Sequence, residues 1–253
     1  MERVFITGAS SGIGAALALF YARRGARIAL VGRRRDVLEN LAARLPGEHV
    51  VFALDVRDRE HLHAAAREFL EEGPVDVVVA SAGISVGTLT EELDDFAVFR
   101  AVHETNLLAT VATFEPFISS MRQRGAGTLV GIASVAGVRG LPGAGAYSAS
   151  KAAVRAYCES LRVELRGSGL RVVTISPGFI RTPMTAANPY RMPFLMPVED
   201  FARQALRHID RGTRHVVIPW QMGVVARLLR CVPGWLYDRV AATRKRKPRS
   251  SGV

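Results

Sequence analysis

The chain has 253 residues, with 34 Lys or Arg against 23 Asp or Glu, so its formal net charge is +11 and its pI about 10.7. Hydrophobic residues make up 49% and charged residues 23%, a composition that excludes a disordered chain and fits a buried core. The two cysteines lack Cys-x-x-Cys spacing, which excludes a disulfide framework and favours a reducing compartment such as the cytoplasm. The six histidines do not cluster, so we predict no metal site.

The first predicted strand, 4–7, runs directly into a glycine-rich loop, Thr7-Gly-Ala-Ser-Ser-Gly-Ile-Gly14, and then into a predicted helix over 12–24. Glycine permits a close approach of backbone and ligand, and the amides of a helix N-terminus can bind pyrophosphate. The order strand, glycine turn, helix therefore predicts a dinucleotide site. Its candidate residues are Gly8, Ser10, Ser11, Gly12, Ile13 and Gly14.

The same N-terminal stretch, 4–22, carries no charge, and Gly8-x-x-x-Gly12 also fits the packing motif of membrane helices. However, Gly, Ser and Thr interrupt the segment, and no basic region precedes it as in a signal peptide. We therefore expect neither a membrane span nor a signal peptide here.

Further along the chain, short apolar runs alternate with helical patterns. Strands are predicted at 4–7, 27–32, 49–54, 75–81, 128–133, 171–176 and 215–219, and helices at 12–24, 34–45, 59–72, 94–124, 147–166 and 198–211. This alternation predicts an α/β fold with a parallel sheet, and right-handed crossovers make it doubly wound. We expect a single-domain Rossmann fold over 1–222, with seven parallel strands, helices on both faces and ligands beyond the carboxyl ends of the strands.

Two further residues point to proton transfer. Tyr147 and Lys151 are four residues apart in a predicted helix, so their side chains share one face. A free tyrosine has a pKa of about 10, and a neighbouring cation lowers it by favouring the phenolate. We therefore predict that Lys151 lowers the pKa of Tyr147 and makes it a general acid/base.

Together these motifs resemble the short-chain dehydrogenase/reductase family. The family's glycine pattern is matched by Thr7–Gly14, and its serine and Tyr-x-x-x-Lys pair by Ser134, Tyr147 and Lys151. Its Asn-Asn-Ala-Gly motif stands here as Ala80-Ser-Ala-Gly83, so the asparagine that braces the central sheet in the family is replaced. The resemblance covers 3–220 and implies the Rossmann fold, a nicotinamide cofactor and an oxidoreductase.

The resemblance also assigns roles to individual residues. It implies that Ser134 polarises a substrate carbonyl and Tyr147 protonates its oxygen, while hydride passes from the nicotinamide to the carbonyl carbon. Lys151 tunes Tyr147 and holds the nicotinamide ribose, and Asn106 supports a proton relay through water. The remaining implied cofactor contacts are Asp55, Val56, Ala82, Gly83, Pro177, Gly178, Ile180 and Thr182.

The end of the second predicted strand bears on which nicotinamide is bound. NAD-binding relatives carry an acidic residue where this chain has Gly32, and Arg33 follows at once. Because a guanidinium binds phosphate oxygens in pairs, Arg33 favours NADP(H) through its 2′-phosphate. We expect Arg34 and Arg35 to be surface residues.

Substrate contacts are expected from 84–88, 135–144 and 179–196. The last of these is apolar and contains three methionines, which adapt to varied shapes. It predicts a hydrophobic ketone, aldehyde or alcohol as substrate, although the segment could also simply pack on the core. The sequence does not select among substrates within this class.

The segment 223–253 is predicted to be an amphipathic helix broken at Pro233-Gly234 and followed by a basic tail. Val224, Val225, Leu228, Leu229 and Val232 share one helical face. Such a helix can lie on an anionic membrane surface through 223–249, cover the substrate cleft or meet a partner subunit. It is too short and too charged to span a bilayer.

Two alternatives to the NADP(H)-dependent reductase remain: a nucleotide-binding sensor of the same fold without turnover, and a membrane- or nucleic-acid-associated binding protein. The basic clusters lack the interleaved aromatics that stack on bases, which argues against nucleic acid. The resemblance implies a homodimer or homotetramer formed through two long helices, with Arg155, Tyr157 and Cys158 as candidate interface residues.

Overall fold

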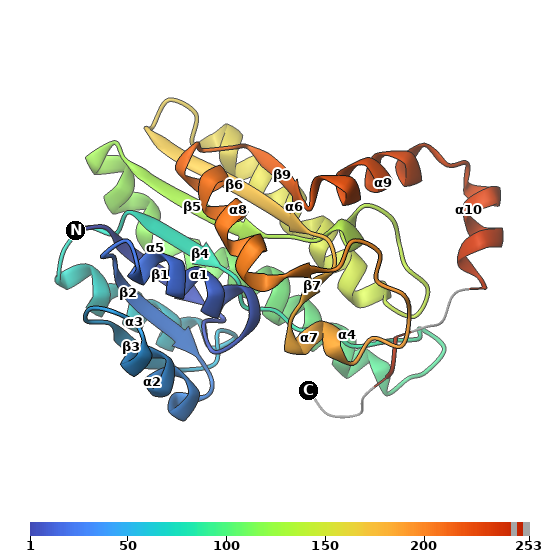
Figure 1. Cartoon of the computed structure of the whole chain (residues 1–253), viewed down its shortest axis with the longest axis horizontal. Coiled ribbons are helices and arrows are strands. Elements are labelled where there is room, and N and C mark those ends of the chain that lie inside the picture. The colour runs from blue at the N-terminus through green and yellow to red at the C-terminus, as the bar shows by residue number, and fades with distance from the viewer. Residues whose placement is uncertain (244–246, 250–253) are drawn as a thin grey trace.

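The computed structural model describes residues 1–243 and 247–249. At its centre lies a parallel sheet of seven strands in the order β3-β2-β1-β4-β5-β6-β9 (Figure 1). The predicted doubly wound α/β fold is thereby confirmed. The strands are β1 (Arg3–Thr7), β2 (Arg27–Gly32), β3 (Val50–Ala53), β4 (Val77–Ala80), β5 (Gly127–Ile132), β6 (Leu170–Pro177) and β9 (His215–Ile218).

The two faces of the sheet are covered by different helices because successive side chains of a strand point to opposite sides. Val4 and Ile6 of β1 face one core cluster, whereas Phe5 faces the other. Phe5 lies 4.9 Å, between ring centroids, from Phe117 of α5. The first face carries α1 (Gly12–Ala22), α2 (Arg35–Arg44) and α8 (Val198–Asp210), and the second carries α3 (Arg59–Glu71), α5 (Ala109–Arg124) and α6 (Gly145–Glu164).

The helix predicted over 94–124 runs from Asp95 to Arg124 without a gap but contains a π-helical turn. The structure has α4 (Asp95–His103), then a π-helical turn η1 (Glu104–Leu108), then α5. A π turn inserts one residue into the helical ladder and is often found at functional sites. Periodicity did not predict it, because the apolar pattern continues on both sides. A 3₁₀ turn, η2 (Val135–Gly137), follows β5.

The apolar segment between β6 and α8 contains short elements that were not predicted. A two-stranded parallel pair, β7 (Ile180–Arg181) with β8 (Met196–Pro197), closes the segment at its base, and α7 (Pro183–Ala186) lies between them. Phe179 and Tyr190 approach with ring centroids 6.4 Å apart, whereas Phe194 is exposed. The segment is therefore a loop tied at both ends rather than one continuous helix.

One expected interface residue is placed elsewhere. Cys158 does not lie on an exposed face of α6: it is fully buried against the sheet, facing Gly131 of β5. Burial raises the pKa of its thiol to about 12, so it remains an inert apolar group. Arg155 and Tyr157 are half-buried.

The C-terminal extension forms α9 (Trp220–Cys231) and α10 (Gly234–Ala241), separated at Pro233 as predicted (Figure 1). Met222 and Ala226 are buried, whereas Val224 and Leu228 remain exposed. Within the described residues, no helix is long and apolar enough to cross a membrane.

Arg139 ties this extension to the Rossmann domain. Its guanidinium donates hydrogen bonds to the carbonyl oxygens of Leu229 (2.9 Å) and Val232 (2.8 Å) and lies 4.2 Å from the ring centroid of Tyr237. Arg139, from the loop after β5, therefore contacts both α9 and α10.

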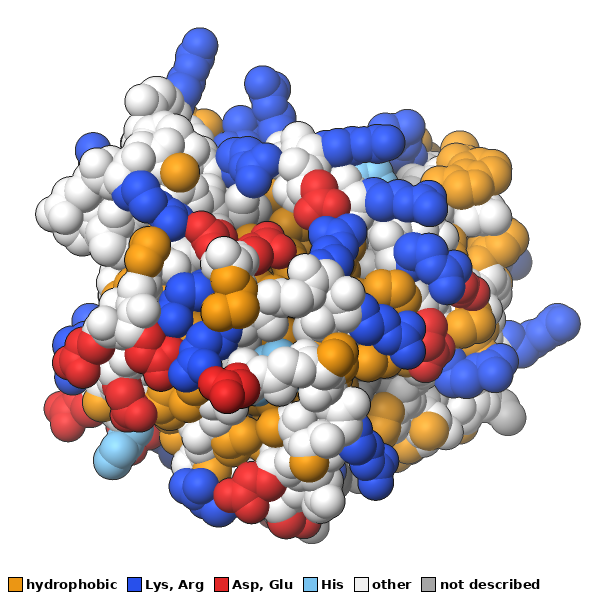
Figure 2. All heavy atoms as spheres, turned by 60° about the vertical axis from the view of Figure 1, so that its left-hand side comes forward, with side chains coloured by type: hydrophobic (Ala, Val, Ile, Leu, Met, Phe, Trp, Pro, Cys, Tyr) orange, Lys and Arg blue, Asp and Glu red, His pale blue; other side chains and the backbone are white. Residues whose placement is uncertain are grey.

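The positive charge is dispersed. Figure 2 shows Lys and Arg side chains scattered over one face among acidic and hydrophobic ones. Many of the arginines form ion pairs, such as Arg27 with Glu72 and Arg124 with Asp76. This face shows no continuous basic stripe of the kind that follows a nucleic-acid backbone.

Candidate active site

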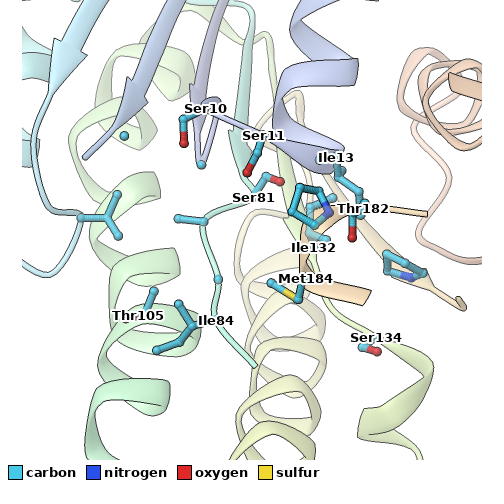
Figure 3. Close-up of a pocket in the computed structure, with 18 of the residues that line it drawn as sticks. Ser10, Ser11, Ile13, Ser81, Ile84, Thr105, Ile132, Ser134, Thr182 and Met184 are labelled. Carbon is cyan, nitrogen blue, oxygen red and sulfur yellow. The ribbon is translucent and has the colours of Figure 1, made fainter. Parts of the chain in front are cut away.

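A cavity of about 380 Å³ opens at the carboxyl ends of the central strands, where ligands of doubly wound folds bind (Figure 3). Of the predicted site residues, only Gly14 and Asn106 do not line it. The residues that do are Gly8, Ser10, Ser11, Gly12, Ile13, Arg33, Asp55, Val56, Ala82, Gly83, Ser134, Tyr147, Lys151, Pro177, Gly178, Ile180 and Thr182.

The glycine loop leaves space that side chains would fill. Gly8 and Gly12 have φ values of 68° and 57°, which L-residues rarely adopt. A Cβ at Gly8 would lie 2.7 Å from the backbone of Ala82, and one at Gly14 would collide with the carbonyl of Gly8. Gly14 therefore serves the turn itself, while Gly8 and Gly12 shape the cavity.

The N-terminus of α1 opens into this cavity. Ser11 occupies the N-cap position, yet its side chain makes no capping hydrogen bond, and Ser10 and Ser11 both lie at the cavity wall (Figure 3). Uncapped amides at a helix N-terminus attract anions. A glycine cradle facing such amides fits the pyrophosphate of a dinucleotide.

Three arginines surround the end of the cavity beside β2 and β3. Arg33 lines it as expected, and so does Arg34, which donates to the hydroxyl (3.0 Å) and carbonyl (3.2 Å) of Ser10. Arg34 is exposed, as expected, but it also lines the cavity and contacts Ser10, which the sequence did not predict. Arg35 does lie at the surface, where it pairs with Glu39 one helical turn away.

Arg57 is the third of these arginines, and sequence reasoning did not identify it. It binds the carboxylate of Asp55 at 2.7 Å, and this hydrogen bonding lowers the pKa of Asp55. Asp55 is therefore held as a carboxylate at the cavity wall. The sequence signal that could have identified Arg57 is a basic residue two positions after Asp55.

Ser134, Tyr147 and Lys151 meet at the opposite end of the cavity. Ser134 follows β5, and its hydroxyl accepts a hydrogen bond from the amide of Ala136 at 3.1 Å. Tyr147 and Lys151 lie in the first two turns of α6, with the Lys151 ammonium 6.0 Å from the phenol ring centroid. Lys151 also donates to the carbonyl of Ile132 at 2.8 Å.

The ionisation of this group differs from the prediction. Burial raises the pKa of Tyr147, and the neighbouring Ser134 hydroxyl only partly opposes this rise. Lys151 does not reverse the shift, because its ammonium lies beside the Ile132 carbonyl rather than at the phenol oxygen. Burial also lowers the pKa of Lys151 to about 8. The predicted lowering of the Tyr147 pKa was therefore wrong, and the phenol stays protonated at neutral pH.

Asn106 lies in the π-helical turn η1 and is fully buried. Its side-chain amide donates to the Ile84 carbonyl (3.0 Å) and the Ser150 hydroxyl (2.9 Å), and its oxygen accepts from the Ile84 amide (2.8 Å). A Cβ at Gly83 would lie 3.1 Å from the Asn106 oxygen and 3.4 Å from the Lys151 ammonium. Asn106 thus fixes the loop after β4 against the start of α6.

Thr7 braces the central sheet where the asparagine of the family motif is missing. Its hydroxyl accepts hydrogen bonds from the amides of Ser81 (3.2 Å) and Ala82 (3.4 Å) and donates to the carbonyl of Val79 (3.4 Å). The strand register places Thr7 opposite Ala80 of β4 and Val31 of β2. The end of β4 is therefore held from β1.

Other cavity residues carry no distinct sequence signal. Ile84, Thr105 and Met184 line the cavity (Figure 3), and so does Thr185. Met184 and Thr185 come from α7, within the apolar segment expected to contact substrate. Among the described residues there is no group of three or more His, Cys, Asp or Glu side chains that could hold a metal ion.

Comparison with known proteins assigns the chain to a family. The sequence profile described as short chain dehydrogenase matches residues 2–191. An uncharacterized oxidoreductase of Myxococcus xanthus (strain DK1622) is 40% identical over 240 residues, covering 93% of this chain and 94% of that protein. The 3-oxoacyl-[acyl-carrier-protein] reductase of Mus musculus is 35% identical, covering 71% and 76%.

Among solved structures, the crystal structure of levodione reductase superposes with a TM-score of 0.79 at 27% identity, covering 88% of this chain and 98% of that one. The matched profile, the relatives and the fold agree with the glycine cradle and the Ser134, Tyr147 and Lys151 group. The chain therefore belongs to the short-chain dehydrogenase/reductase family, a family of oxidoreductases that use a nicotinamide cofactor.

Proposed function

We propose that this protein is an NADP(H)-dependent reductase of hydrophobic ketones or aldehydes, able in principle to oxidise the corresponding alcohols. The observation that carries the proposal is one cavity that joins the glycine cradle, a cluster of arginines and the Ser134, Tyr147 and Lys151 group. A general acid next to a dinucleotide site is what carbonyl reduction requires, and a bound nicotinamide would supply the hydride.

The protein's residues would act on the carbonyl oxygen. The Ser134 hydroxyl would donate a hydrogen bond to that oxygen, which stabilises the negative charge that develops on it. Tyr147, whose pKa burial raises, would then transfer its proton to the oxygen. The Lys151 ammonium would stabilise the phenolate that remains, and Asn106 would keep the loop around Gly83 and Ile84 in place.

Cofactor preference is inferred from the charge at the far end of the cavity. Arg33 and Arg34 line it, and Gly32 stands where an acidic residue would be needed to accept hydrogen bonds from a ribose. A guanidinium can bind the 2′-phosphate through two hydrogen bonds, whereas an unphosphorylated ribose offers no anion to pair with the guanidinium charge. This arrangement favours NADP(H) over NAD(H).

The proposed substrate class rests on the walls of the cavity. Ile84, Ile180 and Met184 line the same cavity as Ser134 and offer mainly apolar surface. Two relatives are named as reductases of a 3-oxoacyl group and of levodione, both of which carry ketones. An apolar body around a ketone or aldehyde therefore fits this chain best.

We also expect a homodimer or homotetramer in the cytoplasm, as is usual for the family. The exposed apolar side chains of α9 and α10, among them Leu228 and Trp235, would contact a second copy or an anionic membrane surface. Light scattering of the purified protein tests for the second copy, and sedimentation with anionic vesicles tests for membrane binding.

The first test is NADPH oxidation over a panel of hydrophobic ketones and aldehydes, with NADH in parallel. Tyr147→Phe removes the proton donor and should lower kcat by about 10² or more while NADPH binding stays nearly unchanged. Tyr157→Phe, on the same helix but outside the cavity, is the matched control and should keep its activity. Full turnover in Tyr147→Phe would disprove the role of Tyr147. Tight NADPH binding without turnover of any compound would favour a nucleotide sensor.

A further inference from the structure

A short piece of the C-terminal tail, residues 247–249, packs against the loop after β4, and its first residue approaches Tyr147; we call this piece the C-terminal strap. In Figure 1 it is the coloured piece beyond α10 that lies beside the segment leading into α4. The amide of Gly87 donates to the Pro248 carbonyl at 3.0 Å, and Gly87 and Arg249 form a parallel β-bridge. The strap therefore packs on the loop that also carries Ile84 of the cavity wall.

Arg249 anchors the strap. Its guanidinium binds both carboxylate oxygens of Asp95, at 2.9 and 3.2 Å, and pairs with Glu92 at 3.0 Å. Asp95 also accepts a hydrogen bond from the amide of Leu89, and the Arg249 hydrogen bond is the main reason that its pKa is lowered. Because this ion pair is bidentate, it holds residues 247–249 in one register against the segment that begins α4.

Lys247 is the residue that this anchoring places near the catalytic group. Its ammonium lies 5.9 Å from the ring centroid of Tyr147, about as far as that of Lys151, and donates to the hydroxyl of Ser85 at 2.6 Å. Within residues 1–243 and 247–249, no carboxylate pairs with it. A half-buried ammonium without an anion is costly, and burial lowers the pKa of Lys247 to about 8.

We propose that Lys247 is a specificity-determining residue that binds an anionic group, such as a carboxylate, on the carbonyl substrate. The ammonium, fixed by the strap beside Tyr147, would meet an anion only a few bonds from the carbonyl that Tyr147 protonates. The substrate would then combine an apolar body with one negative charge close to the reacting carbon. This inference rests on the proposed reductase function and narrows its substrate class.

The test compares 4-oxopentanoate with its methyl ester, two ketones that differ chiefly in charge. Dissociation constants are measured by titration into the full-length protein saturated with NADP⁺, which cannot reduce the ketone, so the readout does not involve turnover. We expect the wild-type protein to bind the carboxylate at least about tenfold more tightly than the ester, because only the carboxylate can form a charge-assisted hydrogen bond with Lys247. Lys247→Met should abolish this preference, and Lys247→Arg should retain it.

Two further variants distinguish the effect of the position of the C-terminal strap from the effect of positive charge alone. Gly87→Ala places a Cβ about where the strap backbone runs, 2.7 Å from the Pro248 carbonyl oxygen, and should weaken the preference without removing any charge. Arg230→Met removes one exposed positive charge on α9 and should leave the preference unchanged. All variants should bind NADPH like the wild type, which shows that they are folded.

The outcomes distinguish the two proposals. Equal binding of both probes by the wild type, or a preference that persists in Lys247→Met, would overturn the role of Lys247. A preference that depends on Lys247 in a protein that never oxidises NADPH would support the anion site and reject the reductase.

Discussion

Lys151 is buried beside the phenol of Tyr147, and its charge is sensitive to pH. With a pKa lowered to about 8, it is protonated below that pH and neutral above it, whereas Tyr147, with a raised pKa, stays protonated over the same range. We therefore expect kcat/KM for the reduction of a neutral ketone to be constant at pH 6 to 7.5 and to fall above about pH 8.

Lys247 titrates in the same range, so the profile should be measured in both the wild type and Lys247→Met. The fall should persist in the variant if Lys151 causes it. A profile that stays flat to pH 9.5 in both proteins would show that the charge of Lys151 is not needed.

Arg33 and Arg34 lie together at the end of the cavity proposed for the 2′-phosphate. Replacing either with Ala should raise the Kd for NADPH about tenfold or more and change the Kd for NADH little, since only NADPH carries the extra phosphate. Arg35→Ala is the matched control, because Arg35 pairs with Glu39 outside the cavity. Equal losses for both cofactors in Arg33→Ala and Arg34→Ala would point to a general role in folding or in binding adenosine.

At the scale of the elements, β5 and α6 touch through a small residue. A Cβ at Gly131 would collide with the sulfur of Cys158, which is fully buried beneath the strand. Gly131→Ala should therefore lower the free energy of unfolding by about 1–3 kcal/mol, as overpacking does. Urea denaturation of the single variants and of Gly131→Ala/Cys158→Ala measures the effect.

The free energy of unfolding of the double variant should exceed, by at least about 1 kcal/mol, the value expected from adding the two single effects. The reason is that removing the sulfur relieves the collision. Strict additivity would mean that the strand moves away from the helix instead.

The elements show what a single sequence can predict. The strands and most helices followed from periodicity, because an element buried against the sheet repeats its apolar residues at a fixed spacing. The π turn at Asn106 was not predictable in this way, because one inserted residue leaves the apolar pattern on both sides intact. The cavity wall near Gly8, Tyr147 and Lys151 was anticipated from motifs.

What the sequence did not predict depends on contacts distant along the chain. Thr7 holds the end of β4 because it lies opposite that strand, and Arg57 lines the cavity, where it pairs with Asp55. Lys247 reaches Tyr147 only because Arg249 meets Asp95, some 150 positions earlier in the chain. The direction of the Tyr147 pKa shift depended on burial, which spacing alone does not measure.

At the scale of the whole molecule, Arg139 is one of the contacts that join the C-terminal helices to the Rossmann domain, beside the buried Met222 and Ala226. Arg139→Met would remove two hydrogen bonds to α9 and its C-terminal end, together with the contact to Tyr237. We expect faster trypsin cleavage within 223–243, while the unfolding midpoint of the core changes little, because the sheet does not depend on this contact.

Arg230→Met, on the same helix and exposed, is the control and should be cleaved like the wild type, apart from the lost site at that residue. Unchanged proteolysis in Arg139→Met would show that α9 and α10 are held by their apolar contacts instead.

The strand order reverses beside β1, with β2 and β3 on one side and β4, β5, β6 and β9 on the other. Gly8, Arg33 and Asp55 therefore come from the first part of the chain, and Ser134, Tyr147 and Thr182 from the second. If the chain were cut between α3 and β4, each fragment would carry only part of the proposed cofactor contacts. A dinucleotide that bridges them would favour their reassembly in proportion to its concentration, which would turn the pair into a split reporter for that cofactor.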